Sequence, residues 1–201
     1  TVNNNNTEVE EEKVGVRIIG GEDYLNAESN TNTLITAGIY GGGYSADVDG
    51  NVTLNIGTVS QNQGINITGN IFGGGYGETT TVTGDVTVNI GKRTNTAQEG
   101  NPVYAYEGYA NITGDVYGGS AKGKVNATKG GTEENPTFSA TDNKATQVNL
   151  YGGTISGDLY GGGLGAGAVM YGSPTLNINM IPGDYAALND RDGNGTADGD
   201  A

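Results

Sequence analysis

One nine-residue phrase occurs four times along this chain of 201 residues. The copies read ITAGIYGGG from Ile35, ITGNIFGGG from Ile67, ITGDVYGGS from Ile112 and ISGDLYGGG from Ile155. Adjacent glycines destabilise a helix and weaken a strand, so each glycine run marks a bend after a short apolar stretch. A phrase that returns after about 20 to 50 residues indicates stacked repeats, in which each unit buries its apolar face against the next.

A second phrase follows each copy of the first. It reads VTLNIG from Val52, VTVNIG from Val86, TQVNLYGG from Thr146 and PTLNIN from Pro174. A lone valine lies between the two phrases in every repeat: Val48, Val82, Val125 and Val169. The stretch GVRIIGG near the N-terminus matches QVNLYGG in the third repeat. The order is therefore half a repeat, four full repeats and a tail.

The corners between strands are short. Only four residues separate Leu150 from Ile155 in VNLYGGTISGDLYGGG, which is a corner and not a loop. Three strands in a turn of about 27 residues are typical of one rung of a parallel β-helix. Corners of successive rungs then stack at about 4.8 Å, and glycine permits this approach. Because parallel crossovers are right-handed, we predict an all-β, right-handed parallel β-helix (β-solenoid) of about four to five rungs.

The chain divides into three segments on this interpretation. Residues 1–33 form an N-terminal arm and a half-rung cap, residues 34–181 the four-repeat solenoid, and residues 182–201 an acidic tail. Strand alternation places Ile155, Gly157 and Leu159 on the core face and Tyr160 on the outer face. The equivalent apolar residues of the other repeats are expected to fill the same thin core.

Two exposed ladders follow from the same alternation. The aromatic ladder consists of Tyr40, Phe72, Tyr117 and Tyr160. It offers a flat surface for sugar rings or a partner, or its rings stack only to stabilise the coil. The Asn ladder consists of Asn55, Asn89, Asn149 and Asn177. We expect its amides to hydrogen-bond one another, with a polar ligand as the alternative.

An insertion between the second and third repeats carries a tyrosine cluster, Tyr104, Tyr106 and Tyr109. Loops that leave a regular scaffold often carry its variable function. We therefore expect this cluster to be a contact surface, or else to pack against the coil.

The composition excludes several functions. The chain has a net charge of −14, which repels nucleic acid and anionic lipid surfaces and attracts cations. Because it contains no histidine and no cysteine, it lacks the usual zinc ligands, the thiol nucleophile and disulfides. No apolar run approaches the roughly 18 residues needed for a membrane-spanning helix. We expect neither nucleic-acid partners nor membrane insertion.

The tail NDRDGNGTADGDA has the spacing of a calcium loop. Hard oxygen ligands fall at alternate loop positions: Asp190, Asp192, Asn194, Thr196 and Asp198. The pattern resembles the calcium loops of EF-hands, dockerins and thrombospondin type 3 repeats, which implies bound Ca²⁺. It departs from them at the twelfth position, where an acidic residue is expected and Ala201 stands. The alternative is a solvated acidic linker.

Catalysis is not expected. The three arginines are dispersed along the sequence, at Arg17, Arg93 and Arg191. Asp115 and Asp158 share a ladder position, but two carboxylates on a flat ladder do not form the cleft in which glycosidase acids flank a sugar about 5–9 Å apart. A polysaccharide-active β-helix enzyme remains a remote alternative.

The phrase I-[ST]-G-[DN]-[IVL]-[YF]-G-G-G, alternating with V-T-V-N-I-x-G, resembles the Gly-rich β-solenoid repeats of large bacterial surface proteins. These are adhesin-like and autotransporter-like exoproteins, and the resemblance covers residues 34–181. The first copy departs from the pattern at Ala37 and Gly38. The resemblance implies an extracellular location at the cell surface, and a role in adhesion or assembly.

We therefore expect a non-catalytic, extracellular structural or adhesive module. In one mechanism, copies associate end to end into fibres, because open β-edges pair readily. In the alternative, the chain is a spacer segment of a larger adhesin and binds a glycan or another surface protein through its tyrosines.

Overall fold

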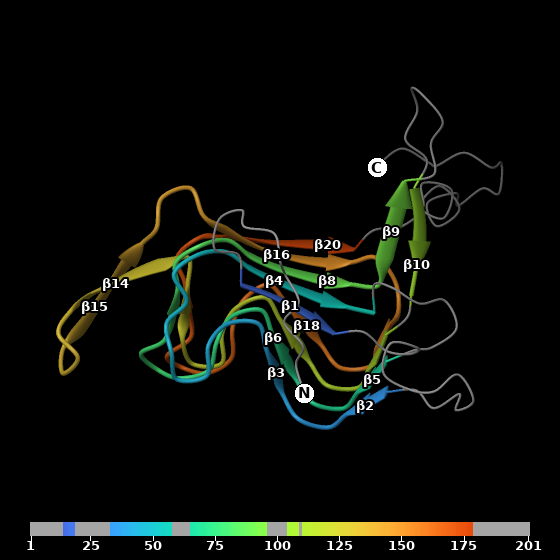
Figure 1. Cartoon of the computed structure of the whole chain (residues 1–201), viewed down its shortest axis with the longest axis horizontal. Helices are drawn as coiled ribbons and strands as arrows, with labels where there is room; N and C mark the ends of the chain where they lie inside the picture. The colour runs from blue at the N-terminus through green and yellow to red at the C-terminus, as the bar shows by residue number, and fades with distance from the viewer. Residues whose placement is uncertain (1–13, 19–32, 58–64, 96–103, 109, 179–201) are drawn as a thin grey trace, which may run out of the picture.

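The computed structural model describes residues 14–18, 33–57, 65–95, 104–108 and 110–178, and these residues form an all-β fold without a helix. Long strands from successive repeats lie side by side in Figure 1, where β4, β8, β16 and β20 run in the same direction. No helix that could cross a membrane is present in these ranges.

Four parallel sheets are built from the described repeats. The first has the order β1 (Val14–Ile18), β4 (Val52–Ile56), β8 (Val86–Ile90), β16 (Ala145–Leu150) and β20 (Ser173–Ile178). The second contains β2 (Thr33–Ile35), β5 (Ile65–Ile67), β11 (Ala110–Ile112) and β17 (Thr154–Ile155). The third contains β3 (Ile39–Tyr40), β6 (Ile71–Phe72), β12 (Val116–Tyr117) and β18 (Leu159–Tyr160). The fourth contains β7 (Thr81–Val82), β13 (Lys124–Val125) and β19 (Val169–Met170).

The chain visits these sheets in the same order in every repeat. Repeat 1 contains β2 to β4, repeat 2 contains β5 to β8, repeat 3 contains β11, β12, β13 and β16, and repeat 4 contains β17 to β20. In repeat 1, Val48 takes the place of a strand in the fourth sheet and bridges to Val82. The half repeat expected near the N-terminus forms β1, which pairs in parallel with β4.

The expectation of three strands in each turn is wrong, because the first phrase bends in its middle. Ile112 belongs to β11 and Val116 to β12, and these strands lie in different sheets. Hydrogen bonds between repeats hold the bend: Asp115 N donates to Asn70 Oδ1 at 3.0 Å, and Ile71 N donates to Asp115 O at 2.9 Å. A bend replaces a straight strand, so the repeats build four parallel sheets instead of three.

The core is a narrow column between these sheets. Its main cluster is fully buried in repeats 2 and 3 and includes Ile67, Ile90, Ile112, Val116 and Val148. A second cluster of valines, among them Val48 and Val82, lies beside the fourth sheet. Side chains in repeats 2 and 3 are fully buried because a neighbouring repeat covers them on each side. Each repeat alone contributes few apolar side chains.

Two antiparallel hairpins interrupt the repeats. One pairs β9 (Lys92–Asn95) with β10 (Tyr104–Glu107), and the other pairs β14 (Ala127–Gly131) with β15 (Pro136–Ala140). They project at opposite ends of the long axis in Figure 1. Lys129 of β14 forms a salt bridge of 3.1 Å with Asp47 of repeat 1, which ties the second hairpin to the coil.

A buried asparagine holds the start of the second hairpin. Asn126 is fully buried and has a left-handed backbone, with φ of 57°. Its Nδ2 donates to the carbonyl oxygens of Gly84 at 2.8 Å and Ala145 at 3.1 Å. Its Oδ1 accepts a hydrogen bond of 2.9 Å from Thr146 Oγ1. One side chain therefore joins repeat 2 to both ends of the insertion in repeat 3.

The glycine corners stack as closely as expected, and this gives a matched pair of substitutions. A Cβ at Gly74 would lie 2.6 Å from Val125 Cγ1 and would collide with Ser120 Oγ, which accepts a hydrogen bond from Gly75 N. A Cβ at Gly162, the equivalent corner of repeat 4, would meet nothing within 4 Å. The difference arises because no described repeat follows repeat 4.

We predict that Gly74→Ala lowers the free energy of unfolding by about 1–3 kcal/mol, because the collision forces the corners apart. Gly162→Ala is expected to raise it by about 0.4–1 kcal/mol, since alanine restricts the unfolded chain. Urea unfolding followed by circular dichroism measures both values. Equal losses in the two variants would contradict the stacking argument.

Candidate functional site

The aromatic ladder, Tyr40, Phe72, Tyr117 and Tyr160, lies at the ends of strands in the third sheet. Strand pairing sets these residues in register, so their rings stack. Successive ring centroids are 5.2, 4.9 and 4.8 Å apart, and the rings are parallel to within 9°. The stacking expected from the repeat spacing is therefore present.

Exposure along this ladder differs from the expectation of a continuous open surface. Phe72 and Tyr117 are only 3% and 5% exposed, whereas Tyr160 is 42% exposed. Neighbouring rings cover both faces of the middle members, and Tyr76 and Ala121 pack against the same cluster. The prediction of exposure is wrong for Phe72 and Tyr117, because a second ladder covers them.

The second ladder consists of Tyr44, Tyr76, Ala121 and Leu164, which are joined by parallel bridges. Tyr44 and Tyr76 stack with centroids 4.8 Å apart, and both present an edge-to-face contact to Tyr40. The sequence carries a signal for it, because the residue after each GGG or GGS corner reads Tyr, Tyr, Ala and Leu. We did not predict this ladder from the sequence.

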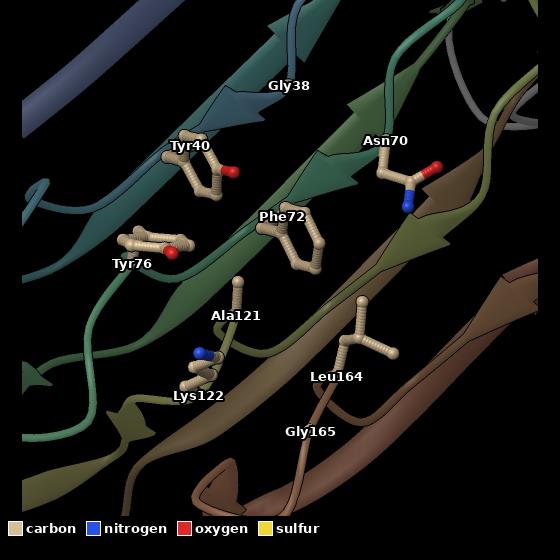
Figure 2. Close-up of a pocket in the computed structure, with 9 residues that line it drawn as sticks. All are labelled: Gly38, Tyr40, Asn70, Phe72, Tyr76, Ala121, Lys122, Leu164 and Gly165. Atoms are coloured by element: carbon tan, nitrogen blue, oxygen red, sulfur yellow. The ribbon is translucent and has the colours of Figure 1, made fainter.

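A groove of about 330 Å³ lies between the two ladders (Figure 2). We call it the aromatic groove, and its lining is Gly38, Tyr40, Asn70, Phe72, Tyr76, Ala121, Lys122, Leu164 and Gly165. The tyrosine stack of the second ladder stops at Ala121, whose methyl group is too small to fill the space of a ring. The groove therefore lies where a third ring is missing.

Lys122 supplies the charge in this lining. Its backbone is left-handed, with φ of 69°, and its amide N donates to Leu164 O at 2.8 Å. The equivalent corners of the other repeats are also left-handed and hold Ser45, Gly77 and Gly165. A lysine at such a corner is strained, whereas glycine would not be.

The Asn ladder forms the chain of amide hydrogen bonds that we expected. Asn89 Nδ2 donates to Asn55 Oδ1 at 2.7 Å, and the two following bonds, Asn149 to Asn89 and Asn177 to Asn149, are 2.8 Å long. The amides thereby satisfy one another, and this ladder stabilises the stacking of the first sheet.

Asp115 and Asp158 also link successive repeats. Asp158 N donates to Asp115 Oδ1 at 2.9 Å, and the hydroxyls of Tyr117 and Tyr160 donate to Oδ2 of Asp115 and Asp158 at 3.1 and 3.0 Å. Burial, and then the hydrogen bond to Asp115, raises the pKa of Tyr117 above its ordinary value of 10.0. Each of these carboxylates therefore accepts a hydrogen bond from a tyrosine.

We predict that Tyr117 loses its proton only above pH 10, the ordinary tyrosine pKa. Because the raised pKa favours the neutral phenol in the folded state, the associated stabilisation is present below pH 10 and is lost as the pH rises through the folded-state pKa. Titration of ¹³C-labelled tyrosine by NMR measures the value. Asp115→Asn should lower it, and a Tyr117 that titrates at or below 10 would contradict the prediction.

The repeat-4 edge, formed by the outer sides of β17 to β20, is a second candidate surface. Leu176 and Ile178 point toward the core column, yet they are 42% and 64% exposed. Their partners in the preceding repeat, Val148 and Leu150, are fully and partly buried. Among the described residues, no further strand pairs with the outer sides of β17 to β20, so the repeat-4 edge presents strand backbone together with core-type side chains.

The remaining predicted site residues lie either in the first hairpin or outside the described residues. Tyr104 and Tyr106 lie in β10, opposite Asn95 and Arg93 of β9. Tyr109 and the calcium-loop residues Asp190, Asp192, Asn194, Thr196 and Asp198 lie outside the described residues. Within the described residues, no group of three or more acidic side chains is placed to hold a metal ion.

No family model, curated protein or solved structure matches this chain. The aromatic groove and the repeat-4 edge are therefore the two surfaces from which a function can be proposed.

Proposed function

We propose that this chain is a right-handed parallel β-helix, or β-solenoid, that acts as a non-catalytic structural and adhesive module of a bacterial surface protein outside the cell. The fixed order in which the chain visits four parallel sheets supports the β-helix, and right-handed crossovers are the rule for parallel strands. The repeat sequence supports the surface role through its resemblance to adhesin-like repeats.

We further propose that copies associate end to end, and the exposed core residues of the repeat-4 edge are the observation that carries this proposal. At the other end of the first sheet, β1 is the edge strand. The register places Val16 in the column of Leu176 and Ile18 in that of Ile178. A second copy can therefore add β1 to β20 in continuous register. Such a head-to-tail contact does not close, so it produces a filament.

The net charge of −14 fits this form of assembly. Like-charged sides repel one another, which limits lateral association, while the apolar ends attract. We propose in addition that Ca²⁺ bound by the loop at Asp190–Asp198 strengthens the association, so that chelator should weaken it.

Sedimentation velocity and electron microscopy of the purified chain, in millimolar Ca²⁺ and with chelator, test the assembly. We expect a concentration-dependent series of oligomers or filaments. Ile178→Asp should abolish them with little effect on the stability of the monomer, because Ile178 is 64% exposed. The register of the first sheet places Ile178 in the column of Ile18, so the introduced carboxylate would be buried at the joint between two copies.

Ser139→Asp is a matched control, because Ser139 is exposed in β15 of the β14–β15 hairpin and lies away from the repeat-4 edge. It should leave assembly unchanged. A wild-type chain that stays monomeric at every concentration, or an Ile178→Asp variant that assembles normally, would refute end-to-end association.

A second candidate function is a spacer segment of a larger adhesin that binds a glycan or a protein along its side. The aromatic groove is the observation that favours it.

A further inference from the structure

The aromatic groove continues a ring stack that the protein itself does not complete. Tyr44 and Tyr76 are parallel to within 5° and 4.8 Å apart, which is the spacing of successive strands. Ala121 takes the next position of this ladder, and Leu164 the one after it. Tyr44 covers one face of the Tyr76 ring. A flat ring placed over Ala121 would therefore contact the other face of Tyr76 and lie beside Phe72 (Figure 2).

Polar groups at the rim of the groove indicate which kind of ring it would bind. Asn70 uses Oδ1 to accept a hydrogen bond from Asp115 N, and within the described residues its Nδ2 makes no hydrogen bond. The hydroxyls of Tyr40 and Tyr76 and the ammonium of Lys122 are further donors. A pyranose has an apolar C–H face for an aromatic ring and hydroxyl groups around its edge. It matches this combination better than a wholly apolar aromatic ring does.

The charge at the groove favours an anionic ligand. The chain is strongly acidic overall, but the charged side chain in the groove lining is Lys122. It occupies a left-handed corner that holds serine or glycine in the other repeats, and a strained residue beside a groove is often kept for function. A carboxylate on the bound ring would pair with this ammonium.

We propose that the aromatic groove binds an acidic sugar of a glycan, with the pyranose ring over Ala121 against Tyr76 and its carboxylate at Lys122. The groove lies along the side of the repeats and not at the repeat-4 edge. This inference is therefore independent of end-to-end assembly.

NMR titration of the isotopically labelled chain tests the inference. The probes are trigalacturonate and a hyaluronan tetrasaccharide, which present two common uronic acids, and maltotriose is the uncharged match. We expect saturable shifts at Tyr76, Ala121 and Lys122 with at least one uronate probe. Maltotriose should bind at least about fivefold more weakly, because it lacks the ion pair. Absence of saturable shifts with both uronates, or equal binding of maltotriose, would overturn the proposal.

Two variants separate groove binding from general effects on the fold. Ala121→Phe should fill the missing ring position and abolish the shifts, and a retained melting temperature would show that the fold persists. Lys122→Gly should relieve the strained corner and reduce uronate binding to the level of maltotriose. Uronate binding that survives Ala121→Phe would overturn the proposal. The proposal would also fail if N-acetyl-tyrosinamide bound this groove and the uronates did not, because a protein side chain would then be the ligand.

Discussion

Replacement of Ile90 by alanine is expected to lower the free energy of unfolding by about 2–5 kcal/mol, the usual cost of a cavity in a packed core. Ile90 is fully buried and lies in the core column with Ile56 and Leu150. Repeats on both sides surround it, so the structure can close the cavity only by moving several strands. This is the largest loss that we expect from a single truncation of the column.

Ile178→Ala is the matched control, because Ile178 continues the same column in β20 but is 64% exposed. Its truncation should cost less than about 1 kcal/mol, since little area is buried. Urea unfolding of monomeric samples at low concentration compares the two variants. Similar losses for both would mean that the ends are covered as well as the centre.

A second large effect is expected from Asn126→Asp. The exchange keeps the shape of the side chain but removes both donors, so the carbonyl oxygens of Gly84 and Ala145 would face a buried carboxylate. We expect a loss of about 3–5 kcal/mol at pH 7, because a buried charge without a partner is strongly unfavourable. The loss should be smaller at pH 4, where the introduced carboxyl takes up a proton and becomes neutral.

Asn143→Asp is its control, because Asn143 is also left-handed, with φ of 56°, but exposed. Thermal unfolding of both variants at the two pH values measures the difference. If Asn126→Asp is no more destabilising than Asn143→Asp, Asn126 does not hold the insertion to the coil.

Much of the fold follows from the repeated phrases. Because Asn55, Asn89 and Asn149 occupy the same place in the second phrase, their alignment in the sequence predicts the register of the first sheet. The same alignment predicts the amide ladder and the ring stack, since equivalent residues of stacked strands lie about 4.8 Å apart. A repeat period, apolar alternation and turn glycines all act locally, so they can be identified without coordinates.

The candidate surfaces could be predicted only in part. The aromatic ladder was found from the sequence, but its burial was not, because Tyr76 and Ala121 pack against Phe72 only after the glycine runs have folded the chain back. Lys122 and Ala121 carry no motif of their own. They matter only because they line the groove next to the rings of Tyr76 and Phe72.

The repeated phrases are sufficient to predict an all-β fold, the order of the repeats and the residues that stack. They do not predict the bend between Ile112 and Val116, because the hydrogen bonds that hold it join Asp115 to Asn70 of the neighbouring repeat. The groove at Ala121 also depends on tertiary contacts, since a missing ring leaves a hollow only when tyrosines are stacked beside it. Both the bend and the groove arise from contacts between repeats, and such contacts cannot be read from the sequence of one repeat.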